Sequence, residues 1–373
     1  MSARAEPSIA SDSRLFAPSS INGLHLENRL VVAPMTRVSA THEGLVTDAM
    51  VRYYRRFAAG WFALVITEGI YTDQAFSQGY RHQPGLSDRA QAEAWRKVTA
   101  AVHAEGGRIF AQLMHAGALS QFNRFRDHSV GPSAVRPKGE QMSIYRGAGD
   151  YALPREMSHE EIREALAGFA RAAALAIEVA GFDGVEIHAA NGYLLDQFLT
   201  DYTNRREDDW GGGVTNRIRL AIEVVRRIRE SIGRAVPLGV RISQAKVNDF
   251  AHKWAGADED AAAIFGALAA TDIDYMHVTE FEAWRPAFKS GEASLVALAR
   301  NNAPAMVVIA NGNLHEPERA EALVRQGADL IALGKGALSN PDWPRRVRSG
   351  CELTSFDPRL LNPLADIKVS EQV

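Results

Sequence analysis

Asp183-Gly184-Val185-Glu186-Ile187-His188 is the stretch that indicates how this chain folds. In it an aspartate precedes a short apolar strand pattern, and the last residue of the strand stands five positions after the aspartate. The same spacing recurs towards the C-terminus, from Asp274 to Thr279 and from Asp329 to Gly334. A helix-end segment precedes the aspartate each time. The repeat predicts equivalent strands that alternate with helices and end at one edge of a sheet.

Eight short apolar runs are spread along the chain, and several are continuous rather than alternating, as is typical of parallel strands buried on both faces. The runs occupy residues 30–33, 63–66, 109–112, 185–187, 238–240, 275–278, 306–309 and 330–333. Helical patterns fill the gaps. The clearest cover residues 215–232, with apolar residues three and four apart, 158–181, which opens with a capping box of Ser158 and Glu161, 90–105 and 317–326.

Strands and helices in this order predict an α/β fold, a (β/α)8 TIM barrel built as one domain over residues 1–373. A doubly wound open sheet is the competing arrangement, but no Gly-x-Gly-x-x-Gly motif follows an early strand. Residues 116–157, after the third strand, are too long for an ordinary barrel loop, so we expect a lid over the barrel mouth. Residues 15–26 are expected to form a hairpin that closes the opposite end, and residues 1–14 to be disordered.

The composition excludes several classes of function. Lys and Arg total 42 against 45 Asp and Glu, so the formal net charge is -3 and no basic field exists to attract nucleic acid or an anionic membrane. The N-terminus is polar, and no apolar run approaches the roughly 18 residues of a membrane span. The single cysteine, Cys351, excludes internal disulfides and cysteine-rich metal sites within this chain. We therefore expect a soluble cytoplasmic protein.

Barrel enzymes carry their chemistry at the C-terminal ends of the strands, and here those ends are polar or glycine. They read Thr36-Arg37, Thr67-Glu68-Gly69, Gln112 with His115, His188 with Asn191 and Tyr193, Arg241-Ile242-Ser243, Thr279-Glu280, Asn311-Gly312-Asn313 and Gly334-Lys335-Gly336. The clustered carboxylates and His-x-His pairs of metal-dependent barrels are absent near these ends, so no metal is expected.

The last two strand ends combine glycines with the cation of Lys335, and a possible helix start follows at Asn340-Pro341-Asp342. Phosphate cradles are commonly built after strands seven and eight of a barrel, so a phosphorylated ligand is indicated. The alternative is that these glycines serve only tight turns.

Three other strand ends supply Thr36, Gln112 and Arg241, whose donors suit a heteroatom-rich ring system that gains negative charge. The segment from His188 through Asn191 to Tyr193 places two donors and a phenol together, a grouping that can hold a carbonyl oxygen and hand over a proton. A histidine after a strand can also be a purely structural hydrogen-bonding residue.

With these motifs in place, the chain resembles the Old Yellow Enzyme family of FMN-dependent ene-reductases over roughly residues 15–348. The motifs that carry the resemblance are Ala33-Pro34-Met35-Thr36-Arg37, Gln112-Leu113-x-His115-Ala116-Gly117, residues 188–199 from His188 to Leu199, Asn204-Arg205-Arg206 with Trp210-Gly211-Gly212, and Asn340-Pro341-Asp342. They occur in family order, and most fall at or beside an independently predicted strand end.

The resemblance implies that FMN lies across the barrel mouth. The residues implied to bind it are Pro34, Met35, Thr36, Gly69, Gln112, Arg241, Asn311, Gly312, Gly334 and Lys335. Among them, Arg241 would stabilise the reduced anionic ring and Thr36 would tune its redox poise. Asn311, Gly312, Gly334 and Lys335 would hold the phosphate.

The resemblance also implies the reaction. NADPH or NADH would reduce FMN and leave, and a small activated alkene, an α,β-unsaturated carbonyl or nitro compound, would then be reduced in the same site by a ping-pong mechanism. His188 and Asn191 would bind the activating oxygen, and Tyr193 would donate the proton. The aromatic residues Tyr80, Phe281 and Trp284 are candidates for substrate contacts.

Two residues depart from the family pattern. Lys335 stands where an arginine is usual, and Ala118 stands where many relatives carry an arginine, so the phosphate contact and a nearby loop are in question. The sequence also leaves open a flavin-free barrel lyase or aldolase acting on a phosphorylated substrate, for which no reactive lysine stands out in the central strands. A monomer or homodimer is expected.

Overall fold

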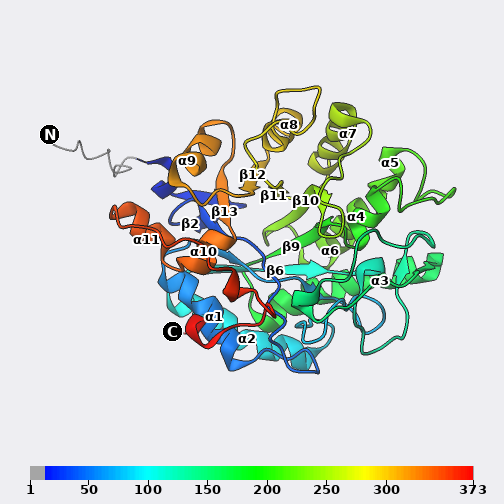
Figure 1. Ribbon diagram of the computed structural model, residues 1–373, viewed down its shortest axis with the longest axis horizontal. Helices are drawn as coiled ribbons and strands as arrows, with labels where there is room; N and C mark the ends of the chain where they lie inside the picture. The colour runs from blue at the N-terminus through cyan, green and yellow to red at the C-terminus, as the bar shows by residue number, and fades with distance from the viewer. Residues whose placement is uncertain (1–12, 373) are drawn as a thin grey trace.

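The eight predicted strands form a closed parallel barrel in the computed structural model, which describes residues 13–372 (Figure 1). Around the barrel the order is β4, β3, β13, β12, β11, β10, β9 and β6, and pairing of β4 with β6 closes the ring. The strands are β3 (Leu30–Val32), β4 (Leu64–Ile66), β6 (Arg108–Met114), β9 (Gly184–Asn191), β10 (Leu238–Lys246), β11 (Tyr275–Thr279), β12 (Val307–Asn311) and β13 (Leu330–Leu333). The TIM-barrel prediction is confirmed.

Strands β9 and β10 run several residues beyond the apolar patterns that predicted them. The apolar runs end at Ile187 and Val240, whereas the pairing of the two strands continues as far as Asn191 and Lys246, with an irregularity after Ile242. The extension consists mostly of polar residues, which the apolar pattern could not indicate. It carries the functional segment upward into the barrel mouth.

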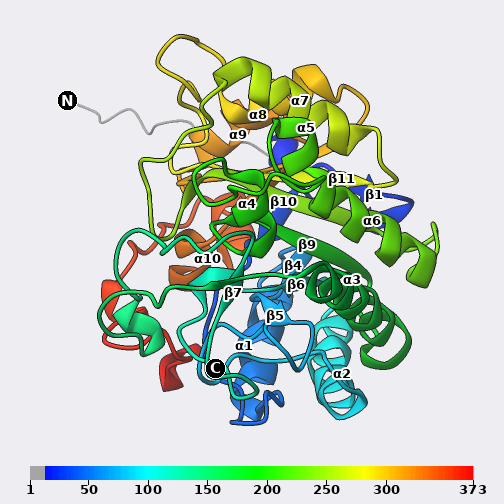
Figure 2. The ribbon, with the colours of Figure 1, turned by 90° about the vertical axis from the view of Figure 1, so that its right-hand side faces the viewer.

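The four predicted helices are present, and others cover the rest of the barrel (Figure 2). The long helices are α1 (Asp48–Ala59), α2 (Arg89–Ala104), α3 (His159–Ala174), α6 (Arg219–Ile232), α7 (Ala257–Ala269), α8 (Leu295–Asn302) and α9 (Pro317–Arg325). The short ones are α4 (Leu194–Leu199), α5 (Val214–Arg217), α10 (Lys335–Ser339) and α11 (Trp343–Arg348). The predicted helix 215–232 is divided at Ile218 into α5 and α6. The capping box of Ser158 and Glu161 opens α3 as expected.

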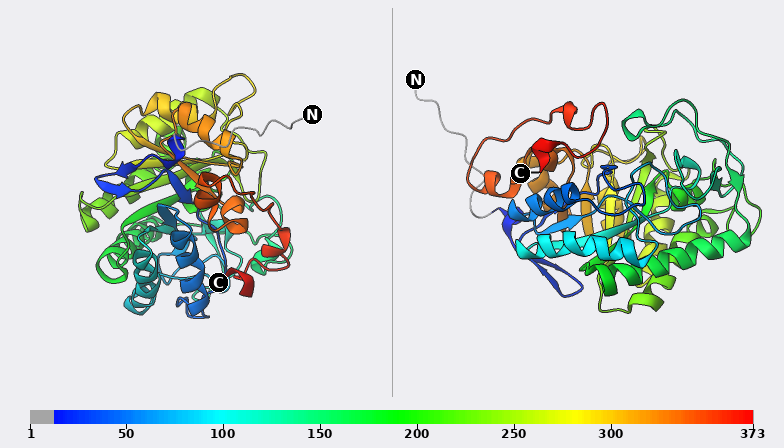
Figure 3. Two further views of the ribbon diagram at one scale, coloured as in Figure 1. Left: turned by 90° about the vertical axis from the view of Figure 1, so that its left-hand side faces the viewer. Right: turned by 90° about the horizontal axis from the view of Figure 1, so that it is seen from below.

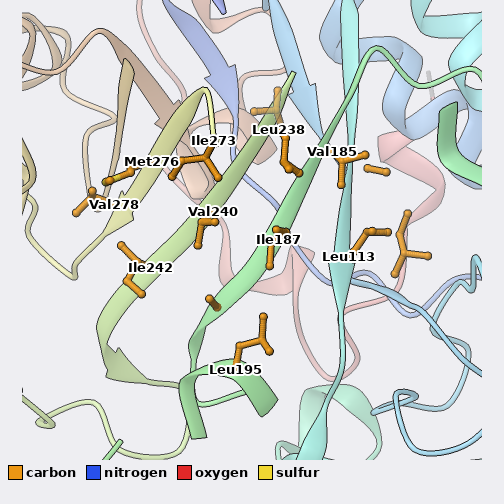
Figure 4. Close-up of a cluster of buried hydrophobic side chains, with 14 of the residues drawn as sticks. Leu113, Val185, Ile187, Leu195, Leu238, Val240, Ile242, Ile273, Met276 and Val278 are labelled. Carbon is orange, nitrogen blue, oxygen red and sulfur yellow. The ribbon is translucent and has the colours of Figure 1, made fainter. Parts of the chain in front are cut away.

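Alternation along the strands separates two groups of side chains. Val185, Ile187 and Val240 point outward into the main core between strands and helices (Figure 4). The alternate residues of the same strands point into the barrel. The lower interior is apolar and includes Phe110 and Tyr275, so polar interior side chains are confined to the upper part of the barrel, near its mouth.

The predicted N-terminal hairpin is formed by β1 (Ser19–Ile21) and β2 (Leu24–Leu26), which pair antiparallel. Ile21 and Leu26 pack against the apolar interior residues and close this end of the barrel, away from the C-terminal segment (Figure 3). Disorder was expected for residues 1–14. Residues 1–12 lie outside the described part, and for the last two the expectation is wrong, because the Ser13 side chain caps a 3-10 turn that begins at Arg14.

Residues 116–157, the predicted lid, pack beside the end of β9 at the barrel mouth. They hold two short strands, β7 (Val130–Gly131) and β8 (Arg155–Glu156), which pair with each other, and two short 3-10 turns. Met142 and Tyr145 of the lid pack against Tyr193 at the end of β9. The N–H of Ala365 donates to the carbonyl of Ile144, so the C-terminal segment is joined to the lid (Figure 2).

Residues 13–372 contain neither a helix suited to crossing a membrane nor a cluster of metal-binding side chains. None of their helices combines the length and the apolar character that a membrane crossing needs. No group of three or more His, Cys, Asp or Glu side chains in the same range is arranged to hold a metal ion.

Candidate active site

Four neighbouring strands bring polar side chains together inside the upper barrel. In the strand register Gln112 of β6 lies beside Glu186 of β9, and Arg241 of β10 lies between His188 of β9 and His277 of β11. Side chains along a strand point alternately to its two faces, and residues paired in register lie at similar height. These five side chains therefore enter the barrel together from adjacent strands. The fold alone therefore assembles a polar layer above the apolar interior.

His188 is almost fully buried, and its Nδ1 has no hydrogen-bond partner among residues 13–372. Burial, followed by the positive charge of Arg241 and the proximity of His277, holds the pKa of His188 well below its ordinary value. The imidazole is therefore neutral at physiological pH and offers one donor and one acceptor. An unpartnered buried nitrogen is costly, which indicates a position for a ligand atom.

Asn191, Gly192 and Tyr193 form the turn that leaves β9. Asn191 and Gly192 both have positive φ, 62° and 88°, a conformation that glycine adopts freely. The Asn191 N–H donates to Ser243 Oγ at 2.8 Å, and the Gly192 N–H donates to Asp196 Oδ2 at 2.6 Å.

Below this turn, Lys246 Nζ contacts both carboxylate oxygens of Asp196 at 2.8 and 2.9 Å, and both side chains are buried. The acceptor of the Gly192 N–H is therefore itself held in place. This ion pair stabilises the turn that contains Asn191 and Tyr193.

Tyr193 lies at the start of α4, and its ring centroid is 4.9 Å from that of His188. Its hydroxyl is 2.5 Å from the hydroxyl of Tyr80, a fully buried residue packed against Tyr145 of the lid. Burial raises the pKa of Tyr193 far above its ordinary value. The phenol is therefore protonated at every physiological pH.

Arg241 is buried, and its two terminal nitrogens are engaged. Nη2 donates to Asn311 Oδ1 at 3.0 Å and Nη1 donates to His277 Nε2 at 3.0 Å, whereas Nε has no partner among residues 13–372. Burial lowers the pKa of Arg241 to about 10, so the guanidinium remains charged at neutral pH. A buried cation with a free N–H is suited to a ligand that becomes negatively charged.

Residues 34–36 extend beyond β3, and Pro34, Met35 and Thr36 are each half-buried at the rim of the barrel. Gly69 follows β4 and is buried, and a Cβ there would approach Met114 Sδ to 2.6 Å. A side chain at position 69 would thus displace Met114.

A cavity of about 270 Å³ opens between the ends of the last strands. Asn311, Gly312, Gly334 and Lys335 line it, together with Asn191 on the opposite side. Gly312 has φ of 142° and no room for a side chain, because a Cβ would lie 1.6 Å from a backbone oxygen. At Gly312 the cavity wall is therefore backbone, which suits the close approach of a phosphate. The Lys335 side chain is exposed, with its amine 5.3 Å from the ring centroid of Phe356.

The three candidate substrate aromatics lie in different places. Phe281 is 75% exposed at the rim of the cavity. Tyr80 is remote from the cavity wall and meets Tyr193 instead. Trp284 does not line the cavity described here, because its ring packs on the core under the guanidinium of Arg319, 4.3 Å from the ring centroid. The structure thus does not bring Trp284 to the site.

Several residues of the site were missed from the sequence. Glu186 and His277 are fully buried in the polar layer, and Asp196 with Lys246 supports the turn. A carboxylate in the middle of an apolar strand, as at Glu186, is the one signal that could have pointed to them. Phe250, which is 80% exposed, also lines the cavity, and no sequence motif pointed to this residue.

The site fits FMN on the evidence of its own atoms. His188 Nδ1 and Arg241 Nε are buried donors or acceptors without partners, and they lie on strands whose ends open towards the cavity that Gly312 lines. The unpartnered atoms suit a polar ring edge, and the backbone wall at Gly312 and the amine of Lys335 suit a phosphate. A bound flavin can supply a hydrogen-bond partner for each of these unpartnered atoms.

Comparison with known proteins agrees with this fit. The model of the NADH:flavin oxidoreductase / NADH oxidase family matches residues 14–354. A probable flavin mononucleotide-dependent alkene reductase from Leishmania infantum is 36% identical over 352 residues, covering 92% of this chain and 93% of that protein.

Two solved structures have the same fold. The old yellow enzyme homologue from Zymomonas mobilis superposes with a TM-score of 0.84 at 32% identity, covering 96% of this chain and 98% of that one. Morphinone reductase in complex with tetrahydroNAD superposes with a TM-score of 0.82 at 31% identity, covering 93% of each chain. The chain belongs to the NADH:flavin oxidoreductase / NADH oxidase family, the flavoprotein group of Old Yellow Enzyme.

Proposed function

We propose that this protein is an FMN-dependent ene-reductase that uses NADPH or NADH to reduce the C=C bond of α,β-unsaturated carbonyl or nitro compounds. The observation that carries the proposal is the unpartnered His188 Nδ1 beside Tyr193, on the strand next to a buried and charged Arg241 whose Nε has no partner among residues 13–372. A substrate oxygen needs a donor, the reacting carbon needs a proton, and the redox group needs a cation. One end of the barrel supplies all three.

The residues proposed to hold FMN come from six strand ends. Pro34, Met35, Thr36 and Gly69 form one side, Gln112 and Arg241 the polar layer, and Asn311, Gly312, Gly334 and Lys335 the phosphate end. FMN held by these residues would supply hydride-transfer chemistry, from the nicotinamide to the β-carbon of the alkene.

The activating oxygen of the alkene is bound by His188 and Asn191. Negative charge builds on this oxygen as the alkene is reduced, and preorganised donors in a site that excludes water stabilise it by several kcal/mol. Ser243 Oγ and the Asp196 carboxylate hold the backbone of the left-handed turn at Asn191 in place before substrate binds. No reorganisation is then needed during the reaction.

Tyr193 donates the proton to the α-carbon. Its raised pKa keeps the phenol protonated, and the neighbouring Tyr80 hydroxyl can donate to the phenol oxygen while the Tyr193 proton faces the site. The charge that would remain on the Tyr193 oxygen therefore has a hydrogen-bond donor already in place.

A lyase or aldolase that works through a lysine Schiff base is not supported. Lys246 is the buried lysine at the barrel mouth, and its amine is held by the Asp196 carboxylate. Lys335 is exposed at the phosphate end of the cavity. Neither amine is placed to attack a carbonyl within the polar layer.

We further propose that residues 1–373 act as one FMN-binding domain in the cytoplasm, as a monomer or homodimer, with no nucleic-acid partner. The balanced charge and the single closed barrel of residues 13–372 support this proposal.

The test is the colour of the purified protein. A yellow protein that is bleached anaerobically by NADPH or NADH and recoloured by cyclohexenone is the expected result. A colourless protein that binds no added FMN would overturn the proposal, and so would a flavin that the nicotinamide bleaches but that no α,β-unsaturated carbonyl or nitro compound recolours. Stopped-flow reduction with each nicotinamide then identifies the preferred reductant.

A further inference from the structure

We propose that Glu186 and His277 are positioning residues that set the hydrogen-bonding direction of Gln112 and the charge balance of Arg241, and thereby the reduction potential of the bound flavin. The inference rests on the proposed function, since it assigns the flavin edge to Gln112 and Arg241. It concerns two side chains that touch neither the proposed substrate oxygen nor the proton donor.

Glu186 and His277 are both completely inaccessible to solvent. They lie in the polar layer between the apolar lower barrel and the candidate site, on β9 and β11 respectively. Burial of a carboxylate is unfavourable unless it is paired and hydrogen-bonded. A pair of residues kept at such a cost beneath a ligand site needs an explanation beyond packing.

The first step is the orientation of Gln112. Glu186 Oε1 accepts from Gln112 Nε2 at 2.8 Å. An ionised carboxylate only accepts hydrogen bonds, so the opposite orientation of the amide would place two oxygens in contact. The amide nitrogen must face Glu186, and Gln112 Oε1, which has no partner among residues 13–372, is left as an acceptor for a ligand N–H.

The second step is the tautomer of His277. Glu186 Oε2 accepts from His277 Nδ1 at 2.8 Å, and Arg241 Nη1 lies 3.0 Å from His277 Nε2 and 3.4 Å from His277 Nδ1. The neutral ring with its proton on Nδ1 satisfies the Glu186 contact and leaves the unprotonated Nε2 as the nearer acceptor for Arg241. Burial lowers the pKa of His277, which agrees with a neutral ring. The hydrogen bonds therefore run in one direction, from Arg241 through His277 to Glu186.

The third step is the charge of the layer. Burial alone would raise the pKa of Glu186, but hydrogen bonds from His277 and Gln112 and the positive charge of Arg241 hold this pKa below its ordinary value, so the carboxylate is ionised. The layer then contains one anion and one cation, and the anion partly cancels the field of Arg241 at the site. Because reduction adds negative charge to a flavin, the carboxylate opposes reduction and keeps the potential lower than Arg241 alone would make it.

The experiment compares the midpoint potential and FMN affinity of the holoenzyme with those of Glu186→Gln. This substitution keeps the shape, removes the charge and no longer dictates the Gln112 orientation. We expect the midpoint potential to become more positive and the dissociation constant for FMN to rise by about tenfold, the effect of losing one well-directed hydrogen bond. An unchanged potential in a yellow, folded variant overturns the inference and leaves the proposed function intact.

Two controls separate this role from a general effect of burial. Glu371→Gln removes another buried carboxylate, one paired with Arg37 and Arg56 and without a contact to the polar layer. It should lower the melting temperature without shifting the potential. His277→Gln retains a donor and an acceptor and keeps the Glu186 charge, so its potential should remain closer to that of the parent. A positive shift of equal size in all three variants contradicts the inference.

A measurement on the unaltered protein covers the case in which Glu186→Gln does not fold. Nitrogen-15 NMR of histidine-labelled protein, with His277 assigned by its loss in His277→Gln, reports which ring nitrogen carries the proton. A neutral ring protonated at Nδ1 supports the inference, and an Nδ1-unprotonated or doubly protonated ring overturns it. The result does not require FMN, so it also distinguishes this failure from failure of the proposed function.

Discussion

The hydroxyl groups of Tyr80 and Tyr193 lie 2.5 Å apart, with the two rings at 87° to each other. The two residues are 113 positions apart in the chain, one in the loop after β5 (Ile70–Tyr71) and the other at the end of β9. A hydroxyl proton lies between them, and if Tyr80 donates it, the proton of Tyr193 is free to face the substrate. Tyr193 then has both a proton to give and a donor that stabilises the oxygen left behind.

Tyr193→Phe should separate the two half-reactions. The substitution removes the proton donor but leaves His188, Arg241 and the proposed FMN contacts unchanged. We expect reduction of the flavin by the nicotinamide to stay within about twofold, and the alkene half-reaction to slow by about 10²–10⁴-fold, the usual contribution of general acid catalysis. Stopped-flow absorbance measures each half-reaction separately. Equal slowing of both would contradict the assigned role.

Tyr80→Phe tests the hydrogen bond between the two phenols. Loss of one hydrogen bond to a developing charge should slow the alkene half-reaction by about tenfold and leave flavin reduction unchanged. Tyr151→Phe is the matched control, because Tyr151 is buried in the same cluster but has its hydroxyl on Gln121. If Tyr151→Phe slows alkene reduction as strongly as Tyr80→Phe, the effect is one of packing.

Lys335 should determine how tightly FMN is held. Lys335→Ala removes the point charge at the phosphate end of the cavity, and we expect the dissociation constant for FMN to rise by about tenfold or more. Lys335→Arg should lower it, because a guanidinium can contact two phosphate oxygens at once. Fluorescence titration of apoprotein with FMN measures both. Equal affinity in all three proteins would place the phosphate elsewhere.

Glu371 should be important for stability because it joins the C-terminal segment to the barrel. Its carboxylate pairs with Arg37 at 2.5 Å and with Arg56 at 3.1 Å, and all three side chains are nearly inaccessible. Glu371→Ala leaves two buried cations unpaired, so the free energy of unfolding should fall by about 3–5 kcal/mol. The exposed pair of Arg55 and Glu105 provides the control, since Glu105→Ala should change it by less than about 1 kcal/mol. Urea denaturation distinguishes the two.

Glu68 should make the protein less stable as the pH rises. Burial raises the pKa of this carboxyl from 4.5 to about 7. The folded state therefore binds a proton that the unfolded state releases, so the stabilisation is complete below about pH 4.5 and is lost as the pH rises towards 7. The contribution is up to about 3 kcal/mol, at about 1.4 kcal/mol per pH unit. Unfolding of Glu68→Gln should lack this decline between pH 5 and 7. An identical pH dependence in both proteins would rule out Glu68 as its source.

The strand positions could be predicted because a parallel barrel buries its strands on both faces, and continuous apolar runs such as 330–333 are rare elsewhere. The helix from Ser158 to Gly181 could be predicted from its capping box and terminal glycine. The π-helical turn at Leu175–Ala180 within it could not, because no local residue pattern marks it.

The donor set of the site was predictable for a related reason. The C-terminal ends of barrel strands lie around one mouth, so the sequence alone could assign Gln112, His188 and Arg241 to the same site. Trp284 shows the limit of this argument. It follows β11 closely in sequence, but the turn after Ala283 directs its ring under Arg319 and away from the cavity.

The amino-acid sequence alone determined the barrel, the order of its strands and the chemical types that meet at its mouth, because these depend on periodicity and on which residues end each strand. Only the tertiary structure decided which atoms pair: Tyr80 with Tyr193, Asp196 with Lys246, and Glu186 with Gln112 and His277. Those pairings join residues from separate strands and loops, and their geometry depends on the closure of the whole ring, which no local pattern encodes.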